Sequence, residues 1–147
     1  MALDQITTNF NRVEFATSHK KGAAIVVDYA LAVWLQRIRD FLGCRVIISS
    51  GHRPHTPKSL HGIGQAADFY AIPNGGGRVA LPRLFEAALA TKNPEIQGGI
   101  GVYPEDRFIH IDVRPDFLRW TRRKGEYIYQ LEPAYQKIQD AYLALES

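Results

Sequence analysis

The hydrophobic positions of the chain switch between helical spacing and strand alternation. Between residues 23 and 42 apolar side chains recur every three or four positions, which predicts a helix ending at Gly43, a residue suited to a left-handed cap. A second helix is predicted over residues 81–92, with Pro82 in its first turn. A C-terminal helix is predicted over residues 133–147. The helical segments are therefore separated by the strand-like parts of the chain.

Short runs of apolar or alternating residues predict four strands, over residues 45–50, 65–71, 98–103 and 107–114. Residues 1–20 form an irregular lead-in, for which Phe10, Val13 and Phe15 are the candidate anchors. Helices followed by strands that need not be parallel predict an α+β fold, with the helices packed on a mostly antiparallel sheet. The length of 147 residues suits a single domain, 1–147.

Composition and charge narrow the class of protein. Hydrophobic residues make up 46% of the chain, and a net charge of +3 gives only a mild basic excess. No basic run is interleaved with aromatics, so we expect no nucleic-acid partner. No secretory signal is recognisable and no stretch approaches the ~20 apolar residues of a membrane span. We expect a monomer that is synthesised in the cytoplasm and meets its substrate elsewhere.

The segment RFIHIDVR carries the most informative pattern. Strand alternation places Ile109 and Ile111 on one face and His110, Asp112 and Arg114 on the other. A histidine, a carboxylate and a guanidinium in a row are costly to bury unless they line a wet cleft or a metal site. An ordinary solvent-facing strand is the alternative interpretation.

A second group of residues lies in SLHGIGQAADF. His61 and Asp68 would be ~10 Å apart along a continuous helix, too far to share one ion with bonds of ~2 Å. Gly62 and Gly64 make a helix unfavourable and permit a sharp turn that folds His61 back beside Asp68 on the next strand. Two histidines and a carboxylate, completed by His110, are a standard set of catalytic zinc ligands.

The chain resembles the zinc D-Ala-D-Ala carboxypeptidase family, whose fold is shared with hedgehog signalling domains. The resemblance is closest to the branch of bacterial murein endopeptidases and phage endolysins. It is carried, in the family's order, by SGHRP (50–54), SLHGIGQAADF (59–69) and GGIGVYPEDRFIHIDVR (98–114). It extends loosely to NFNRVEF and so covers most of the chain up to about Trp120.

The resemblance implies a zinc peptidase with His61, Asp68 and His110 as the metal ligands. It also implies that Arg53 holds or polarises a carbonyl or carboxylate of the substrate. The zinc would activate a water molecule and polarise the scissile carbonyl, while a carboxylate takes the proton. The implied substrates are peptidoglycan stem or cross-link peptides, which contain D-amino acids.

The proton acceptor is where the sequence departs from better-known family members. They carry an acidic residue three positions before the last zinc histidine, where this chain has Arg107. The candidates are Asp112, on the same strand face as His110, and Asp106 in the preceding turn. Asp112 can also orient a ligand from behind, or simply pair with Arg114 or Arg53.

Three further residues are candidates for substrate binding. His52 and His55 can reach the cleft from their loop, and Tyr103 lies at a strand end where it can donate to an oxyanion. The alternative for each is a solvent-exposed or packed side chain with no role in substrate binding.

Two other functions compete with the peptidase. A zinc-containing module that binds the cell wall or builds a virion would keep the metal without a working base. A small nucleic-acid-binding protein has only the basic pI in its favour. For the peptidase, we expect action on the cell wall after release by lysis or from a virion, in keeping with a phage or prophage origin.

Overall fold

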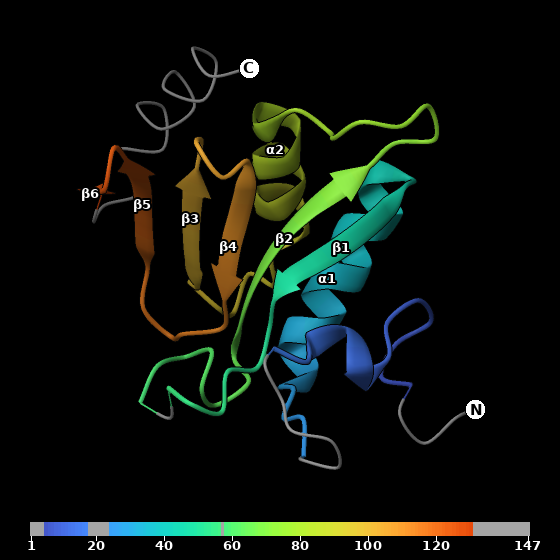
Figure 1. The fold of residues 1–147 in the computed structure, drawn as a ribbon, viewed down its shortest axis with the longest axis vertical. Helices are drawn as coiled ribbons and strands as arrows, with labels where there is room; N and C mark the ends of the chain where they lie inside the picture. The colour runs from blue at the N-terminus through green and yellow to red at the C-terminus, as the bar shows by residue number, and fades with distance from the viewer. Residues whose placement is uncertain (1–4, 18–23, 57, 131–147) are drawn as a thin grey trace.

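The structure is a computed structural model that describes residues 5–17, 24–56 and 58–130 (Figure 1). Within these residues the chain forms one short 3-10 turn, two helices and six strands. In chain order they are η1 (Arg12–Phe15), α1 (Tyr29–Leu42), β1 (Arg45–Ser50), β2 (Ala66–Ile72), α2 (Leu81–Thr91), β3 (Gly99–Tyr103), β4 (Phe108–Asp112), β5 (Leu118–Arg123) and β6 (Glu126–Gln130).

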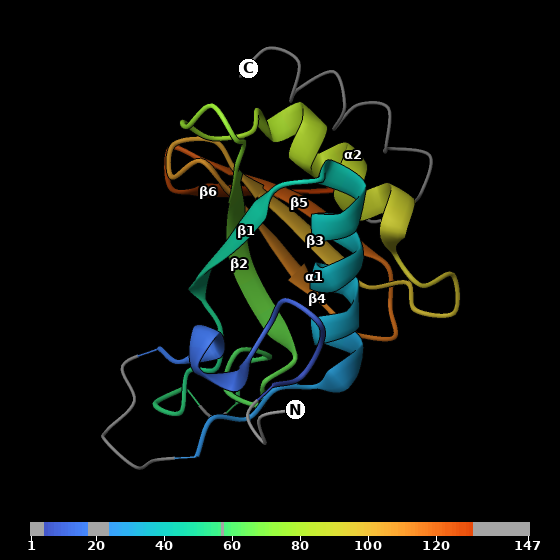
Figure 2. The same ribbon diagram turned by 90° about the vertical axis from the view of Figure 1, so that its right-hand side faces the viewer.

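The six strands form one sheet in the order β1-β2-β4-β3-β5-β6 (Figure 1). Every neighbouring pair is antiparallel except β3 and β5, which run parallel. Both helices cover the same face of the sheet (Figure 2). The predicted α+β fold, with helices on a mostly antiparallel sheet, is confirmed.

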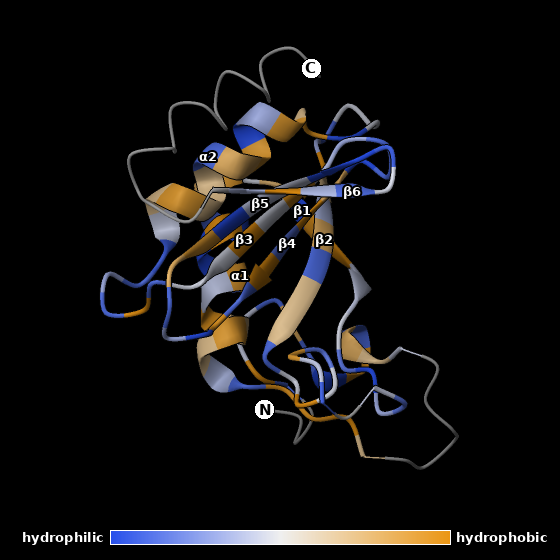
Figure 3. Cartoon of the chain, turned by 90° about the vertical axis from the view of Figure 1, so that its left-hand side faces the viewer, coloured by the Kyte–Doolittle hydropathy of each residue, from blue (hydrophilic) through white to orange (hydrophobic). Residues whose placement is uncertain are grey.

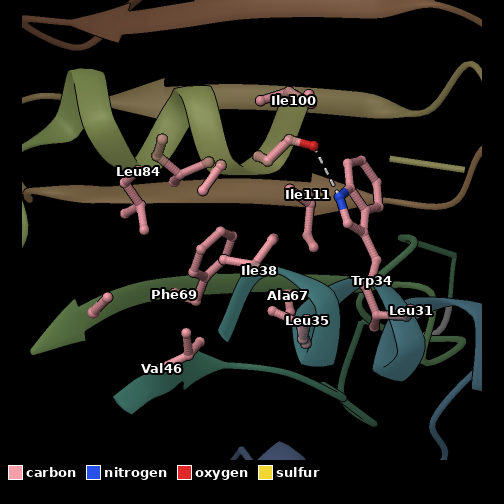
Figure 4. Packing of buried hydrophobic residues seen from close by; sticks show 14 of the residues in the cluster. Leu31, Trp34, Leu35, Ile38, Val46, Ala67, Phe69, Leu84, Ile100 and Ile111 are labelled. Atoms are coloured by element: carbon pink, nitrogen blue, oxygen red, sulfur yellow. Dashed lines mark hydrogen bonds between the residues drawn. The ribbon is translucent and has the colours of Figure 1, made fainter. Parts of the chain in front are cut away.

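The core lies between the helices and the covered sheet face (Figure 4). Ile109 and Ile111 of β4 are fully buried in it, as strand alternation predicts. Trp34 of α1 crosses to α2, where its indole N–H donates to the carbonyl oxygen of Ala88 at 3.0 Å. The opposite face of β4 is therefore left for the polar side chains of the same strand.

Helix α1 begins at Tyr29, six residues later than the predicted helix over 23–42. The carboxylate of Asp28 caps the helix by accepting from the backbone N–H of Ala30 at 2.9 Å. The backbone N–H of Asp28 donates instead to the carbonyl of Gly64. The stretch before Asp28 is thus committed to contacts with the loop after β1, and helical spacing alone does not reveal this.

The sequence prediction missed β5 and β6. They form a hairpin around Lys124 and Gly125, whose positive φ angles of 50° and 78° suit the two-residue turn of a tight hairpin. The mixed composition of LRWTRR hid the alternation of β5, although Gly125 between two alternating runs is a usable signal. The C-terminal helix predicted over residues 133–147 lies outside the described residues.

The described part of the lead-in packs against the rest of the domain. Phe10 and Phe15 are buried as predicted, but Val13 is 64% exposed, so its prediction as an anchor was wrong. Neither α1 nor α2 has the length and apolar character needed to cross a membrane. Hydrophilic residues gather in the loops around the sheet (Figure 3).

Candidate metal centre

Asp68 and His110 face each other across two neighbouring strands. Asp68 of β2 and His110 of β4 are direct partners in the antiparallel ladder. Because partners in a ladder point to the same face, both side chains lie on the sheet face opposite the helices. The Nδ1 atom of His110 is 2.9 Å from the Oδ1 atom of Asp68.

His61 reaches the same place from the loop between β1 and β2. Gly64, three residues later, has a φ of 74°. A side chain at this position would overlap the backbone carbonyl of Val26, so the turn requires a glycine on two grounds. The turn brings the Nε2 atom of His61 to 3.5 Å from Oδ1 of Asp68, which is the approach that the glycine-rich segment predicts.

The three side chains form a compact, buried group of metal-type ligands. The donor atoms of His61, Asp68 and His110 all lie within 4.8 Å of one another. Their exposed fractions are only 6%, 6% and 7%. Among the described residues, no fourth histidine, cysteine or acidic side chain joins this group.

The second nitrogen of each imidazole is already engaged. Nδ1 of His61 lies 2.9 Å from the carbonyl oxygen of Gly51, which can only accept, so this nitrogen carries the proton and Nε2 keeps a lone pair. Nε2 of His110 lies 2.8 Å from Oδ2 of Asp112, which leaves Nδ1 directed at Asp68. The remaining nitrogens, Nε2 of His61 and Nδ1 of His110, thus both point towards Asp68.

Electrostatics keep the carboxylate of the group ionised. Burial raises the pKa of Asp68, but the hydrogen bonds with His110 and His61 outweigh it and lower the pKa to about 2. Burial lowers the pKa of His110, but its bonds to Asp112 and Asp68 outweigh burial and raise it. In the metal-free protein the His110 ring therefore bears its proton between two carboxylates, those of Asp68 and Asp112.

The residues fit a divalent metal ion. Ligands bound at ~2.0–2.2 Å in a tetrahedral arrangement are separated by roughly 3.3 Å, and the separations of 3.5 and 2.9 Å lie on either side of this value. Both ring orientations are fixed by acceptors behind them, which is the usual outer support of metal-binding histidines. The group can therefore hold a metal ion with His61, Asp68 and His110 as ligands.

Asp112 lies behind His110 rather than beside the open side of the group. It is fully buried and accepts five hydrogen bonds, from the backbone N–H of Gly99, from Nε2 of His110 and from three N–H groups of Arg114. A side chain at Gly99 would overlap this carboxylate. Of the roles predicted for Asp112, this placement fits the orientation of a ligand from behind, together with the pairing to Arg114, and not that of a proton acceptor facing the metal.

Arg53 lies beside the metal ligands and remains partly exposed. Its Nε donates to the hydroxyl of Ser50 at 2.7 Å and one Nη2 N–H donates to Oδ2 of Asp68 at 3.0 Å. These bonds use only part of the guanidinium, so further N–H groups remain for a carbonyl or carboxylate. Its side chain is 32% exposed, so a ligand at this surface can reach it.

Of the other predicted site residues, His52 is buried in the loop between β1 and β2, whereas His55 and Asp106 are exposed. Nδ1 of His52 accepts from the backbone N–H of Val26 at 3.1 Å, and its Nε2 donates to the carbonyl of Gly62 at 3.1 Å. These bonds give His52 the task of holding the loop that carries His61. His55 is exposed on the same loop, and Asp106 is exposed in the turn between β3 and β4.

Tyr103 and Trp120 form the wall next to His110. The Trp120 ring lies 4.9 Å from the His110 ring, and its indole N–H donates to the hydroxyl of Tyr103 at 3.1 Å. Gly101 lies beneath this ring, where any side chain would overlap it. Burial is the largest cause and raises the pKa of Tyr103 to about 12, although the hydrogen bond from Trp120 acts in the opposite direction.

Comparison with known proteins agrees with this site. The family model described as Peptidase M15 matches residues 8–112. The peptidoglycan L,D-endopeptidase MepK of Escherichia coli K12 is 33% identical over 104 residues, which cover 60% of this chain and 52% of that protein. MepK of Shigella flexneri gives the same values. The chain thus spans about half the length of the curated relatives it matches. No solved structure matches it.

Proposed function

Because the chain belongs to the peptidase M15 family, we propose that it is a zinc-dependent peptidase that hydrolyses peptides of bacterial peptidoglycan. The observation that carries the proposal is the buried group of His61, Asp68 and His110, three ligand atoms within 4.8 Å of one another. The family model covers all three residues. The matched relatives are endopeptidases by name, which favours a cut within a cross-link peptide over the trimming of its end.

The ligands and their partners have separate tasks in this proposal. His61, Asp68 and His110 would hold the zinc ion, which would supply an activated water and polarise the scissile carbonyl. Arg53 binds a carbonyl or carboxylate of the substrate through its remaining N–H groups. Tyr103, protonated at all physiological pH values, donates a hydrogen bond from its hydroxyl to the oxygen that gains charge.

Asp112 acts in this proposal as a positioning residue. It accepts the Nε2–H of His110 and so leaves Nδ1 free to bind the metal. Its own charge is balanced by Arg114, with Nε–Oδ1 and Nη2–Oδ2 distances of 2.7 and 2.8 Å. This paired bond fixes the carboxylate plane, and with it the plane of the histidine ring.

One observation favours a second candidate function, a zinc-holding module that binds the wall without cutting it. Among the described residues, no second carboxylate joins His61, Asp68 and His110 in the ligand group, and Asp112 is committed to the other ring nitrogen of His110 and to Arg114. Such a module would keep the metal site and the affinity for the wall, and would release no fragments.

The test combines metal analysis with digestion of purified peptidoglycan. We expect about one zinc ion per chain at His61, Asp68 and His110, soluble fragments from the wall, loss of cleavage with a chelator, and its return with zinc. Mass spectrometry of the fragments identifies the bond. Zinc with binding but no cleavage of any wall type would support the second candidate, and a chain that binds no zinc would refute both.

A further inference from the structure

The sheet face that carries the metal ligands continues as a row of aromatic side chains to the edge of the sheet. In the register of the ladder, His110 of β4 is opposite Gly101 of β3, Gly101 is beside Trp120 of β5, and Trp120 is opposite Tyr129 of β6. Side chains that are paired across strands share a face. Tyr129 therefore lies on the same face as the candidate metal ligands. It belongs to β6, the strand at the edge of the sheet (Figure 1).

Two tyrosines at this edge are exposed although they are large and aromatic. Tyr127 and Tyr129 are 49% and 55% exposed, and their rings stack with centroids 6.0 Å apart and planes 18° apart. The guanidinium of Arg122 lies 5.4 Å from the Tyr127 ring centroid. Because the two rings stack, each turns one face to the other, and the pair presents its outer ring surface and its phenol hydroxyls, which suits a ligand with one apolar and one polar side.

We propose that Tyr127 and Tyr129, here called the tyrosine shelf, bind a sugar ring of the glycan strand whose peptide is cut at the metal centre. This inference rests on the proposed function and extends it from the peptide to the polymer. A sugar ring presents C–H groups on its flat side and hydroxyl groups around its rim, which matches the stacked rings and their phenol hydroxyls.

The spacing between the shelf and the metal centre fits this substrate. Three strand spacings separate β4 from β6, a distance of roughly 14 Å. An extended peptide of about four residues spans this distance. Peptidoglycan stem peptides have about this length, and a cross-linking peptide leads to a glycan strand on either side of the cut bond.

The charges along this path fit the peptide as well. Arg122 lies beside the shelf with its guanidinium over the Tyr127 ring, whereas Arg114, over the Trp120 ring, is paired with Asp112. Stem peptides carry free carboxylates, which arginine side chains bind well. The face thus offers the Arg122 cation for the peptide and aromatic rings for the sugar.

The experiment compares two soluble substrates with the zinc-loaded protein. One is a cross-linked peptide dimer that carries its disaccharides, and the other is the same dimer without sugar. Because Tyr127 also contacts Tyr103, only Tyr129 is changed. We expect the wild-type protein to prefer the sugar-bearing dimer, and the Tyr129→Ala variant to lose about tenfold in kcat/KM on that substrate alone. Cleavage of the sugar-free dimer reports that the variant is folded and loaded with zinc.

Two further variants make the result specific. Ile128→Ala changes a side chain of β6 that is 41% exposed on the other face, and it should leave both substrates unaffected. Tyr129→Phe keeps the ring and should keep most of the preference. Equal cleavage of both dimers by the wild type, or equal losses on both in Tyr129→Ala, would overturn the proposal. Cleavage of neither dimer by the wild type refutes the proposed function instead, and calorimetric titration of the sugar-bearing dimer then tests the shelf alone.

Discussion

The substitution Asp112→Asn tests how the metal centre is built. Asparagine keeps the shape of the carboxylate but replaces one oxygen with an NH2 group, which cannot accept a hydrogen bond. Oδ1 of Asp112 accepts three bonds, from Gly99 and Arg114, whereas Oδ2 accepts two, from His110 and Arg114. We therefore expect the amide nitrogen to occupy the Oδ2 position, where it faces Nε2 of His110.

This arrangement shifts the proton of the imidazole. To accept from the new NH2 group, His110 must lose its proton from Nε2 and carry it on Nδ1, the atom that faces the metal. Zinc binding then has to reverse this preference. Loss of such an outer partner weakens metal affinity by roughly 10- to 100-fold, which is about 1.4–2.8 kcal/mol.

The assay is a zinc titration against a competing chromophoric chelator, followed by cleavage assays at saturating zinc. Asp112→Asn should bind zinc more weakly and recover much of its activity when zinc is in excess. Asp116→Asn, which changes an exposed acidic residue between β4 and β5, is the matched control and should behave as the wild type. Unchanged zinc affinity together with a large loss of kcat at saturating zinc would refute the reasoning and make Asp112 the proton acceptor.

Three further predictions concern the residues around the metal ligands. Gly64→Ala forces a left-handed residue against the carbonyl of Val26 and should cost at least about 2 kcal/mol of unfolding free energy in denaturant titrations; an unaltered midpoint would contradict the turn geometry. In the metal-free protein, the raised pKa of His110 adds stability that is fully present below pH 6.5 and is lost as pH rises through the raised pKa. The lowered pKa of Asp68 adds stability that is present above pH 3.8 and is lost as pH falls towards about 2. The thermal midpoint should therefore peak between these values, and the increment from added zinc should grow with pH; a pH-independent increment would count against this linkage. Tyr103→Phe should lower kcat about 100-fold with little change in zinc content, and wild-type kcat in this variant would remove the hydroxyl from the mechanism.

The fold class and the positions of the candidate metal ligands could be predicted from the sequence because both depend largely on short-range patterns. Alternation places His110 on the face opposite Ile109 and Ile111, and the structure confirms this placement. The turn at Gly64 could be predicted from the inability of a straight helix to bring His61 to Asp68. In each case the constraint acts within a few residues of the chain.

The remaining features depend on contacts between distant segments. The start of α1 at Tyr29 is decided by hydrogen bonds from the backbone N–H groups of residues 26 and 28 to the loop after β1. The helical spacing of apolar residues does not reveal these bonds. Whether Asp112 orients His110 or accepts a proton depends on which side of the His110 ring it occupies. The spacing of the two residues in the sequence does not decide between the two sides. Tyr127 could not be placed on the face of the metal centre without the parallel pairing of β3 with β5.

The contact between the lead-in and the loop after β1 determines how far the chain can be shortened. His52 donates its backbone N–H to the carbonyl of Phe15 at 2.8 Å, and Gly51 packs so closely on Phe15 that no side chain fits between them. The carbonyl of Gly51 in turn orients the ring of His61. A truncation that removes η1 would thus disturb a candidate zinc ligand some forty-five positions away, so we expect the smallest fragment that keeps the candidate metal centre intact to include η1 and its cap Asn11.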